Sequence, residues 1–359
     1  MKRRVRKCYS GIGGQAVLEG VMMKNNQKYA VAVRTPDGNI SVEVDEYPGI
    51  LHGNWVTKVP FLRGIFNFFD SMVLGIKALN YSADFYDDEE HKETGVDKAA
   101  DKVTGGKGEE LMVAGTIVLA VILALGLFLV LPYVISSLIV RHFDVVNTSL
   151  LAIIEGVIRI VIFILYIVVI SLLKDIHRLY MYHGAEHKCI NCLERGDELT
   201  VANVKKASRL HRRCGTSFLL LVVLISVIVY IFIPPFDQVW LRVLVRILLI
   251  PAVAGISYEV LRLAGRYDNF ITKAISAPGM LMQLLTTKEP TDDMIEVGIE
   301  SVNAIFDWHA FLDSKFRKGE AGDQPQEDLS EEETKDRVPE QSAETAPETA
   351  EGPQQNAEE

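Results

Sequence analysis

Two histidines near the middle of the chain have the spacing of metal ligands. In the segment His183-Gly-Ala-Glu186-His187 the imidazoles are four residues apart, so on a helix they share one face, with Glu186 beside them. His-x-x-Glu-His is the reversed form of the zincin motif, in which both histidines hold zinc and the carboxylate serves a bound water. The pattern predicts a divalent-metal site, best suited to zinc, with Glu186 as the catalytic base.

A second pair of metal-binding residue types follows in His211-Arg-Arg-Cys214. Three of the eight histidines and three of the four cysteines lie between His183 and Cys214. Imidazole nitrogen and thiolate sulfur are donors that zinc prefers, and a catalytic site keeps one position open for water. If the intervening loop returns to the first motif, His211 and Cys214 become its natural further ligands.

Two other interpretations of these residues stay open. Cys189 and Cys192 could join His211 and Cys214 in a closed, structural Cys3His site, which would leave the histidines of the first motif without a metal. Alternatively, the segment holds no metal, and its histidines, arginines and lysines contact lipid headgroups at the cytoplasmic surface.

The elements that position this segment are long apolar runs. Four of them are predicted to be membrane spans, at residues 111–140, 150–173, 217–233 and 239–263. A span needs about 20 apolar residues, so all four qualify, the third only just. The expected fold class is an α-helical integral membrane protein with four transmembrane helices and a small cytoplasmic α+β cap.

The distribution of lysine and arginine predicts the orientation of the spans. Nine of these residues lie in the loop 174–216, between spans two and three, whereas the connection between spans one and two contains only Arg141. Because cytoplasmic loops are rich in lysine and arginine, this loop and both termini are expected in the cytoplasm of a multi-pass plasma-membrane protein.

Charged residues inside the spans need partners. Glu155 and Arg159 are four residues apart on one helix face, and Arg246 enters span four at a similar depth, so Glu155 should bond one or both arginines. A structural clamp is favoured over an ion or proton path. Glu259, near the cytoplasmic end of span four, could reach the metal site or pair with a nearby arginine of its own span.

The region before the spans combines strands with an amphipathic helix. Residues 29–33 and 40–44 alternate apolar and polar around a Pro-Asp-Gly-Asn turn, which predicts a β-hairpin. The glycine-rich segment 11–20 indicates tight backbone approach and is a weak nucleotide signal. In residues 60–82 a narrow polar stripe faces a wide apolar one, so this helix should lie in the membrane interface or pack on the spans with its stripe toward water.

The predicted organisation has six parts. The acidic tail carries a charge of −12 within a total of −10, and its composition of Glu, Thr, Ala and Pro predicts disorder. The parts are a glycine-rich and hairpin region (1–59), the amphipathic helix (60–82), a charged linker (83–110), the transmembrane domain with loop 174–216 (111–265), cytoplasmic helices (266–318) and the tail (319–359).

Five motifs in the chain resemble those of a known protein family. They are Gly13-Gly-Gln-Ala-Val-Leu-Glu-Gly-Val-Met-Met23, Arg63-Gly64, His183-Gly-Ala-Glu-His-Lys188, His211-Arg-Arg-Cys-Gly-Thr-Ser-Phe218 and Leu284-Leu-Thr-Thr-Lys-Glu-Pro290. Over roughly residues 8 to 306 the chain resembles the YqhQ-like family, multi-pass bacterial membrane proteins with a domain of unknown function, often described as predicted metal-dependent enzymes. The family pattern omits Cys189-x-x-Cys192, so the resemblance favours His183, His187, His211 and Cys214 as the ligands.

The leading hypothesis is a metal-dependent hydrolase at the cytoplasmic membrane surface, with Glu186 as general base and a lipid-linked or membrane-protein substrate. The alternative is a non-enzymatic membrane scaffold or accessory factor with a structural metal. A transporter is the third hypothesis, since it rests only on the charged residues inside the spans. No nucleic-acid partner is expected.

Overall fold

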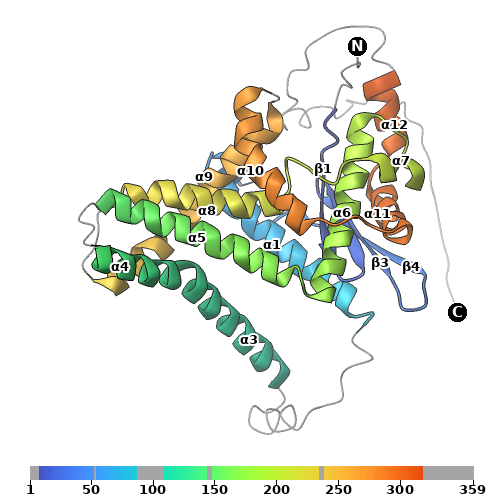
Figure 1. Ribbon diagram of the computed structural model, residues 1–359. Helices are drawn as coiled ribbons and strands as arrows, with labels where there is room; N and C mark the ends of the chain where they lie inside the picture. The colour runs from blue at the N-terminus through green and yellow to red at the C-terminus, as the bar shows by residue number, and fades with distance from the viewer. Residues whose placement is uncertain are drawn as a thin grey trace, which may run out of the picture. The chain divides into compact units, whose positions relative to one another are not determined.

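The computed structural model describes residues 8–51, 54–86, 108–143, 148–233, 238–267 and 269–317. Most of the predicted linker 83–110 and the whole predicted tail 319–359 lie outside these residues. The described part is mostly helical, with one sheet near the N-terminus (Figure 1).

The sheet is a four-stranded antiparallel meander in the order β1-β2-β3-β4. Its strands are β1 (Ile12–Val17), β2 (Gly20–Asn25), β3 (Lys28–Arg34) and β4 (Ile40–Glu46). The predicted hairpin is confirmed as β3 and β4, with Ala32 opposite Val42. The glycine-rich segment 11–20, for which no strand was expected, contains β1, and β2 begins at its last residue.

The two central strands are buried on both faces. Alternate residues face opposite ways, so β2 and β3 contribute to two clusters of buried side chains. One cluster joins Val21, Met23 and Ala32 to helices α6 (Lys174–Arg195) and α11 (Asp292–Ile305). The other joins the opposite face to α1 (Leu62–Ala83), which follows the short helix η1 (Trp55–Lys58).

Three helical stretches are long and apolar enough to cross a membrane: 115–143, 150–170 and 240–266. The first is one continuous helix composed of α3 (Gly108–Leu125), η3 (Gly126–Val130) and α4 (Leu131–Phe143). The other two belong to α5 (Thr148–Ile170) and α9 (Val239–Arg266). The predicted third span corresponds to α8 (Gly215–Ile231), an apolar helix of only 17 residues that packs beside α5 and α9.

A proline explains the irregular turn in the first of these helices. In an α-helix the N–H of residue 132 would bond the carbonyl of Phe128, but Pro132 has no N–H. The helix widens over Gly126–Val130, so that Leu131 N–H bonds the carbonyl of Gly126, five residues back. The Nε–H of Arg159 on α5 donates to the Phe128 carbonyl over 3.0 Å and gives this buried acceptor a partner.

The predicted charge cluster joins α5 to α9. The Glu155 carboxylate accepts hydrogen bonds from Arg159 (2.8 Å) and from Arg246 (2.8 Å to its second oxygen), and all three side chains are buried. The ring of Tyr230 on α8 lies 5.0 Å and 5.1 Å from the two guanidinium groups. Both predicted partners of Glu155 are therefore present, in the arrangement of a clamp.

Helix α1 is amphipathic as predicted, but its polar stripe faces the protein rather than water. Arg63 bonds Glu259 on α9 through two hydrogen bonds of 2.7 and 2.6 Å, and Asn67 bonds the Tyr258 hydroxyl over 2.7 Å. Asp70 accepts from the Tyr47 hydroxyl over 3.1 Å. The polar residues are satisfied internally, and the apolar face is exposed, as expected of a helix in contact with a membrane surface.

Helices follow the last span within residues 266–318, where the sequence predicts them. They are α10 (Phe270–Thr286), α11, α12 (Trp308–Leu312) and the terminal turn η4 (Asp313–Arg317). Helix α7 (Val201–Lys206) begins at Thr200, whose side chain accepts from the N–H of Asn203. Helices α7 and α11 pack together and against α6, on the side of the molecule that carries the sheet (Figure 1).

Candidate metal centre

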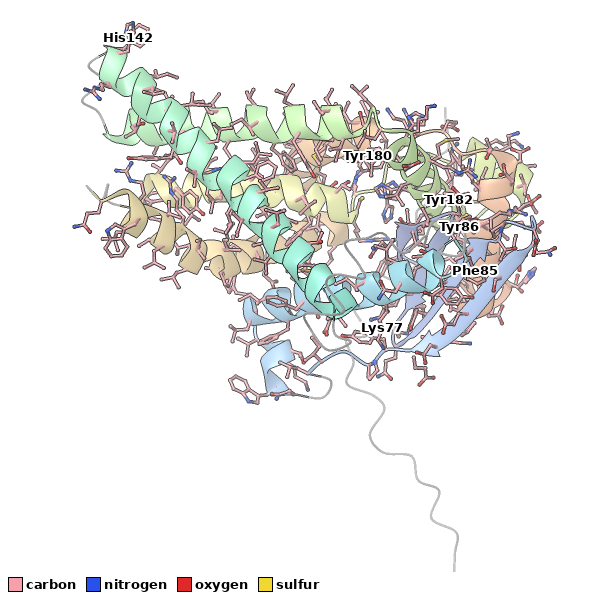
Figure 2. The ribbon with its side chains drawn as sticks, turned by 90° about the horizontal axis from the view of Figure 1, so that it is seen from below. Lys77, Phe85, Tyr86, His142, Tyr180 and Tyr182 are labelled. Atoms are coloured by element: carbon pink, nitrogen blue, oxygen red, sulfur yellow. The ribbon has the colours of Figure 1, made fainter. Side chains whose placement is uncertain are left out.

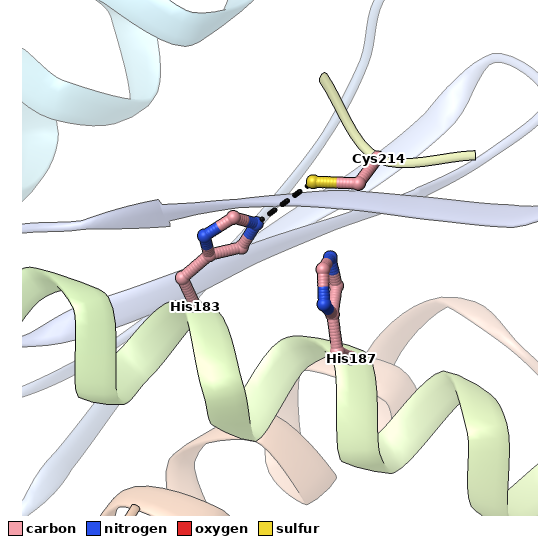
Figure 3. A group of neighbouring side chains, drawn as sticks. All are labelled: His183, His187 and Cys214. Atoms are coloured by element: carbon pink, nitrogen blue, oxygen red, sulfur yellow. Dashed lines mark hydrogen bonds between the residues drawn. The ribbon is translucent and has the colours of Figure 1, made fainter. Parts of the chain in front are cut away.

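Helix α6 presents the two motif histidines on one face toward the start of α8. His183 and His187 are one turn apart, and Cys214 is the residue before the first turn of α8 (Figure 3). One ligand atom from each residue lies within 4.8 Å of the other two. Two imidazoles and a thiol thus converge from two elements that are separated in sequence, in a geometry that could hold a metal ion.

Backbone carbonyls fix the orientation of both rings. His183 Nδ1 lies 2.8 Å from the carbonyl of Thr286, and His187 Nδ1 lies 2.6 Å from the carbonyl of Arg209. A carbonyl only accepts, so each Nδ1 carries the hydrogen and each Nε2 faces the cluster. Metal-binding histidines are commonly oriented in this way.

The thiol lies in a positive environment. His183 Nε2 is 3.1 Å from Cys214 Sγ (dashed in Figure 3). Burial raises the pKa of Cys214, but the fields of His183 and His187 outweigh it and hold the pKa well below its usual value. Burial likewise lowers the pKa of His183, and the neighbouring sulfur overrides it, raising that pKa to about 9. Cys214 therefore favours the thiolate, which is the form that binds metals.

Glu186 lies at the edge of the cluster, beneath the hairpin that β1 and β2 form. Its Oε2 is 4.0 Å from His183 Nε2, and only 5% of the residue is exposed. Burial raises the pKa of this carboxyl, although the two histidines oppose the effect. Gly14 of β1 covers it so closely that a Cβ there would lie 2.8 Å from Glu186 Cγ, which explains one glycine of the N-terminal motif.

The hairpin of β1 and β2 is bound to α6 through Glu19, a residue of its turn. Glu19, with a φ of +50°, accepts from Arg178 Nη2 at 2.5 Å and from the Tyr182 hydroxyl at 3.1 Å. Tyr182 itself is fully buried on the sheet side of the molecule (Figure 2). These contacts hold Gly14 and the rest of the hairpin over Glu186.

Two buried amides hold the segment that returns to the centre. Asn191 Nδ2 donates to the carbonyls of Ser208 (2.8 Å) and Leu210 (3.0 Å). Gln283, which is fully buried on α10, accepts from the N–H of His211 at 2.8 Å and donates to its carbonyl at 2.7 Å. The Arg209 carbonyl that orients His187 is thereby fixed from both sides.

Gly184 allows the third support to approach. A Cβ at this position would lie 2.0 Å from the Lys288 carbonyl oxygen, so no larger residue fits here. The N–H of Lys288 donates to the Tyr180 carbonyl over 2.8 Å, and the adjoining Thr286 carbonyl reaches His183. The glycine inside the motif thus serves the ring orientation of its neighbour.

His211, predicted as a ligand, is directed away from the three converging residues. Its Nε2 lies 3.7 Å from Glu194 Oε2, and Arg213 pairs with the same carboxylate. His211 keeps a ring contact with His187, with centroids 5.6 Å apart. Its clearest role is in the network around Glu194, which also accepts from Ser10.

The remaining predicted site residues lie elsewhere. Cys189 is fully buried against Gly298 of α11, and burial raises its pKa above the usual value. Burial also raises the pKa of Cys192 to about 12, and its Sγ lies near the carbonyls of Asp197 and Glu198. Glu259, bound to Arg63, does not join the centre. Cys189 and Cys192 are thus packed as neutral thiols.

Sequence reasoning missed the groups that support the ligands. Asn191 and Gln283 have no spacing that marks them, and the carbonyls of Arg209 and Thr286 are available in any residue type. The motif 284–290 lay beside Gln283 and includes Thr286, so it was the one available signal for this support.

Comparison with known proteins places this arrangement in a family. Residues 59–308 match the family model described as "Protein of unknown function (DUF1385)". The chain is 38% identical over 308 residues to the uncharacterized protein YqhQ of Bacillus subtilis (strain 168), which covers 85% of this chain and 94% of that relative. No solved structure matches the chain. The match spans the amphipathic helix, the centre and the helices that support it. The chain therefore belongs to the DUF1385 family.

Proposed function

We propose that the protein is a metal-dependent hydrolase embedded in the plasma membrane, with His183, His187 and Cys214 as ligands to zinc and Glu186 as general base. The single observation that carries this proposal is the convergence of the three donor atoms within 4.8 Å. The site works at the cytoplasmic surface, and α8 forms a fourth, short span. The substrate is lipid-linked or is itself a membrane protein.

The chemistry of the donor set supports a metal. His187 Nε2 is buried and has no hydrogen-bond partner among the described residues, although its Nδ1 is bonded. Burying such an atom without a partner costs free energy, which a bound cation would offset. Imidazole nitrogen and thiolate sulfur are both donors that zinc prefers, and catalytic zinc sites commonly have three protein ligands.

The residues around the donors support hydrolysis. A zinc ion held by these residues would supply Lewis acidity and activate water for attack. Glu186, whose Oε2 is 4.0 Å from His183 Nε2, could serve as the general base that takes a proton from the attacking water and returns it to the leaving group. The hairpin above Glu186 excludes bulk solvent, and Thr216 Oγ1, 3.2 Å from Cys214 Sγ, offers a hydrogen bond to the sulfur.

One observation favours a second function, a scaffold or accessory factor with a structural metal. The Glu186 carboxylate lies 4.0 Å from His183 Nε2, so it could itself serve as a fourth ligand, and four protein ligands would close the site. The metal would then only fasten α6 to α8. The buried pairs of Glu155, by contrast, give no support to a transporter.

Metal analysis of the purified protein tests the centre, and complementation tests its role. His183→Ala and Cys214→Ala should lose the metal, whereas Cys192→Ala, a matched control for removal of a buried thiol, should keep it. Glu186→Gln should keep the metal but fail to complement a strain that lacks the gene.

Each result separates the proposals. Metal-free wild-type protein overturns both of them. If Glu186→Gln keeps the metal and complements fully, the ion is structural and the hydrolase proposal is wrong.

A further inference from the structure

A cavity of about 460 Å³ lies between α1, α8 and α9, beside the candidate metal centre. Its volume falls in the range of about 300–1,000 Å³ that is typical of small-molecule sites. Arg213 and Gly215, the two residues that flank Cys214, belong to its lining. The same short segment therefore faces both the metal ligands and the cavity.

The interior of the cavity is apolar. Phe68 of α1 and Phe218 of α8 form one wall, with ring centroids 5.6 Å apart, and Leu261 of α9 contributes another. Three of its polar lining groups are bonded to the protein: Asn67 to the Tyr258 hydroxyl, Ser71 to the Asn67 carbonyl, and Arg213 to Glu194. The side chain of Gln15 is the further polar group of the lining. Few polar groups remain to select a water-soluble ligand, so hydrocarbon is the chemistry that fits.

The mouth of the cavity is continuous with an exposed apolar surface. Met72, Ile76 and Leu219 line the cavity and are also 47%, 55% and 44% exposed. Met72 and Ile76 extend the exposed apolar face of α1 that includes Phe69 and Val73. A hydrocarbon chain can pass from the bilayer into the cavity over this face without meeting water.

We infer that the cavity binds the hydrocarbon chain of a membrane lipid and places its polar head next to the metal centre. This inference rests on the proposed function and deepens it, because it selects a lipid substrate over a membrane protein. Arg213, at the boundary between the cavity and Cys214, is the positioning residue at the head end. The chain supplies the binding energy, and the head is presented to Glu186 and the ligands.

Photo-crosslinking in vesicles tests the inference. Full-length protein is reconstituted in phosphatidylethanolamine and phosphatidylglycerol with a trace of phosphatidylglycerol that carries a diazirine at the end of one acyl chain. After illumination, adducts are mapped by mass spectrometry. Phe68 and Phe218, which line the cavity, should carry adducts in the wild-type protein.

Filling the mouth should abolish this labelling. Met72→Trp and Leu219→Trp exclude at least two methylene groups of the chain, which predicts a loss of adducts at Phe68 and Phe218 of about tenfold or more. Val73→Trp is the matched control, because Val73 is exposed on the same helix but does not line the cavity. It should label like the wild type.

The outcome can be judged separately from the metal proposal. Adducts confined to outward residues such as Val73, or undiminished labelling of Phe218 in both filled variants, would overturn the inference. Labelling of the interior that persists in His183→Ala, a variant without its metal ligand, supports the cavity even if metal analysis rejects the hydrolase. A thermal unfolding temperature of Met72→Trp and Leu219→Trp equal to that of the wild type shows that the filled variants are folded, whatever the metal content.

Discussion

At the scale of single residues, the centre depends on how closely its neighbours approach. The Thr286 carbonyl reaches His183 only because residue 184 is glycine, and the Arg209 carbonyl reaches His187 only because two amides hold its segment. Such supporting contacts commonly change metal affinity as much as some ligands do. The ligand types alone therefore do not set the affinity.

Replacing Gly184 by alanine should weaken metal binding without removing a ligand. The new Cβ would force the Lys288 carbonyl away by more than an ångström, and the Thr286 carbonyl would lose His183 Nδ1. We expect affinity for zinc to fall about 10- to 100-fold in competition with a chelating dye. Gly215→Ala is the control, since a Cβ at Gly215 meets nothing within 4 Å. Equal affinities for all three proteins would contradict this role of Gly184.

The environment of Glu194 predicts that the free energy of unfolding depends on pH. Burial opposes its ionisation, yet hydrogen bonds and charge from His211, Arg213 and Ser10 lower its pKa to about 2. A depressed carboxyl pKa contributes stability that is complete above the unfolded value of about 4.3 and is lost as the pH falls toward the folded value. The two-unit difference corresponds to about 3 kcal/mol at neutral pH.

Thermal unfolding in detergent measures this contribution. Glu194→Gln should be less stable than the wild type at neutral pH, and the gap should narrow steadily below about pH 4. Glu300→Gln, a change on the exposed side of α11, should follow the wild-type curve throughout. A gap that is constant down to pH 2 would show that the carboxylate charge is unimportant.

At the scale of elements, hydropathy predicted most of the helices. It did not predict strand β1 or the packing of the polar stripe of α1, because both depend on contacts with residues far away in the sequence. The glycines of β1 interrupt the alternation that marks a strand, and the segment becomes one only through its pairing with β2 and its cover by α6. The polar stripe of α1 was correctly located, but sequence cannot distinguish a stripe in water from one that meets Glu259 and Tyr258. Likewise, residue types identified His183, His187 and Cys214, whereas the direction of His211 depends on Glu194.

The widened turn of the first long helix makes a prediction about coupling. Arg159 bonds the Phe128 carbonyl because Pro132 supplies no N–H, so Arg159→Met should cost less stability when Pro132→Ala restores that donor. A double-mutant cycle should give a coupling of about 1 kcal/mol. Pro278→Ala, in the separate helix α10, should combine with Arg159→Met additively. Additivity in both cycles would mean that the arginine does not serve this carbonyl.

At the scale of the whole molecule, the distribution of lysine and arginine among the loops predicts which side of the membrane holds the centre. His142 marks the end of α4 away from the sheet (Figure 2). A cysteine at His142 should react with a membrane-impermeant maleimide in intact cells, and one at Lys206 of α7 only after permeabilisation. The wild-type protein is the control for its own cysteines, of which Cys189, Cys192 and Cys214 are buried. The reverse pattern of labelling would invert the predicted orientation.

The attachment of the first hairpin to α6 has a consequence for synthesis. Glu19 leaves the ribosome 159 residues before Arg178, its partner, and two long apolar helices are made in between. On the nascent chain the face of β2 that packs on α6 therefore waits, with Val21 and Met23 uncovered, until both helices have been made. The two apolar helices are therefore inserted before the sheet packs on α6. A mutation that blocks insertion of either helix should leave this face of the sheet exposed and cause the N-terminal region to aggregate.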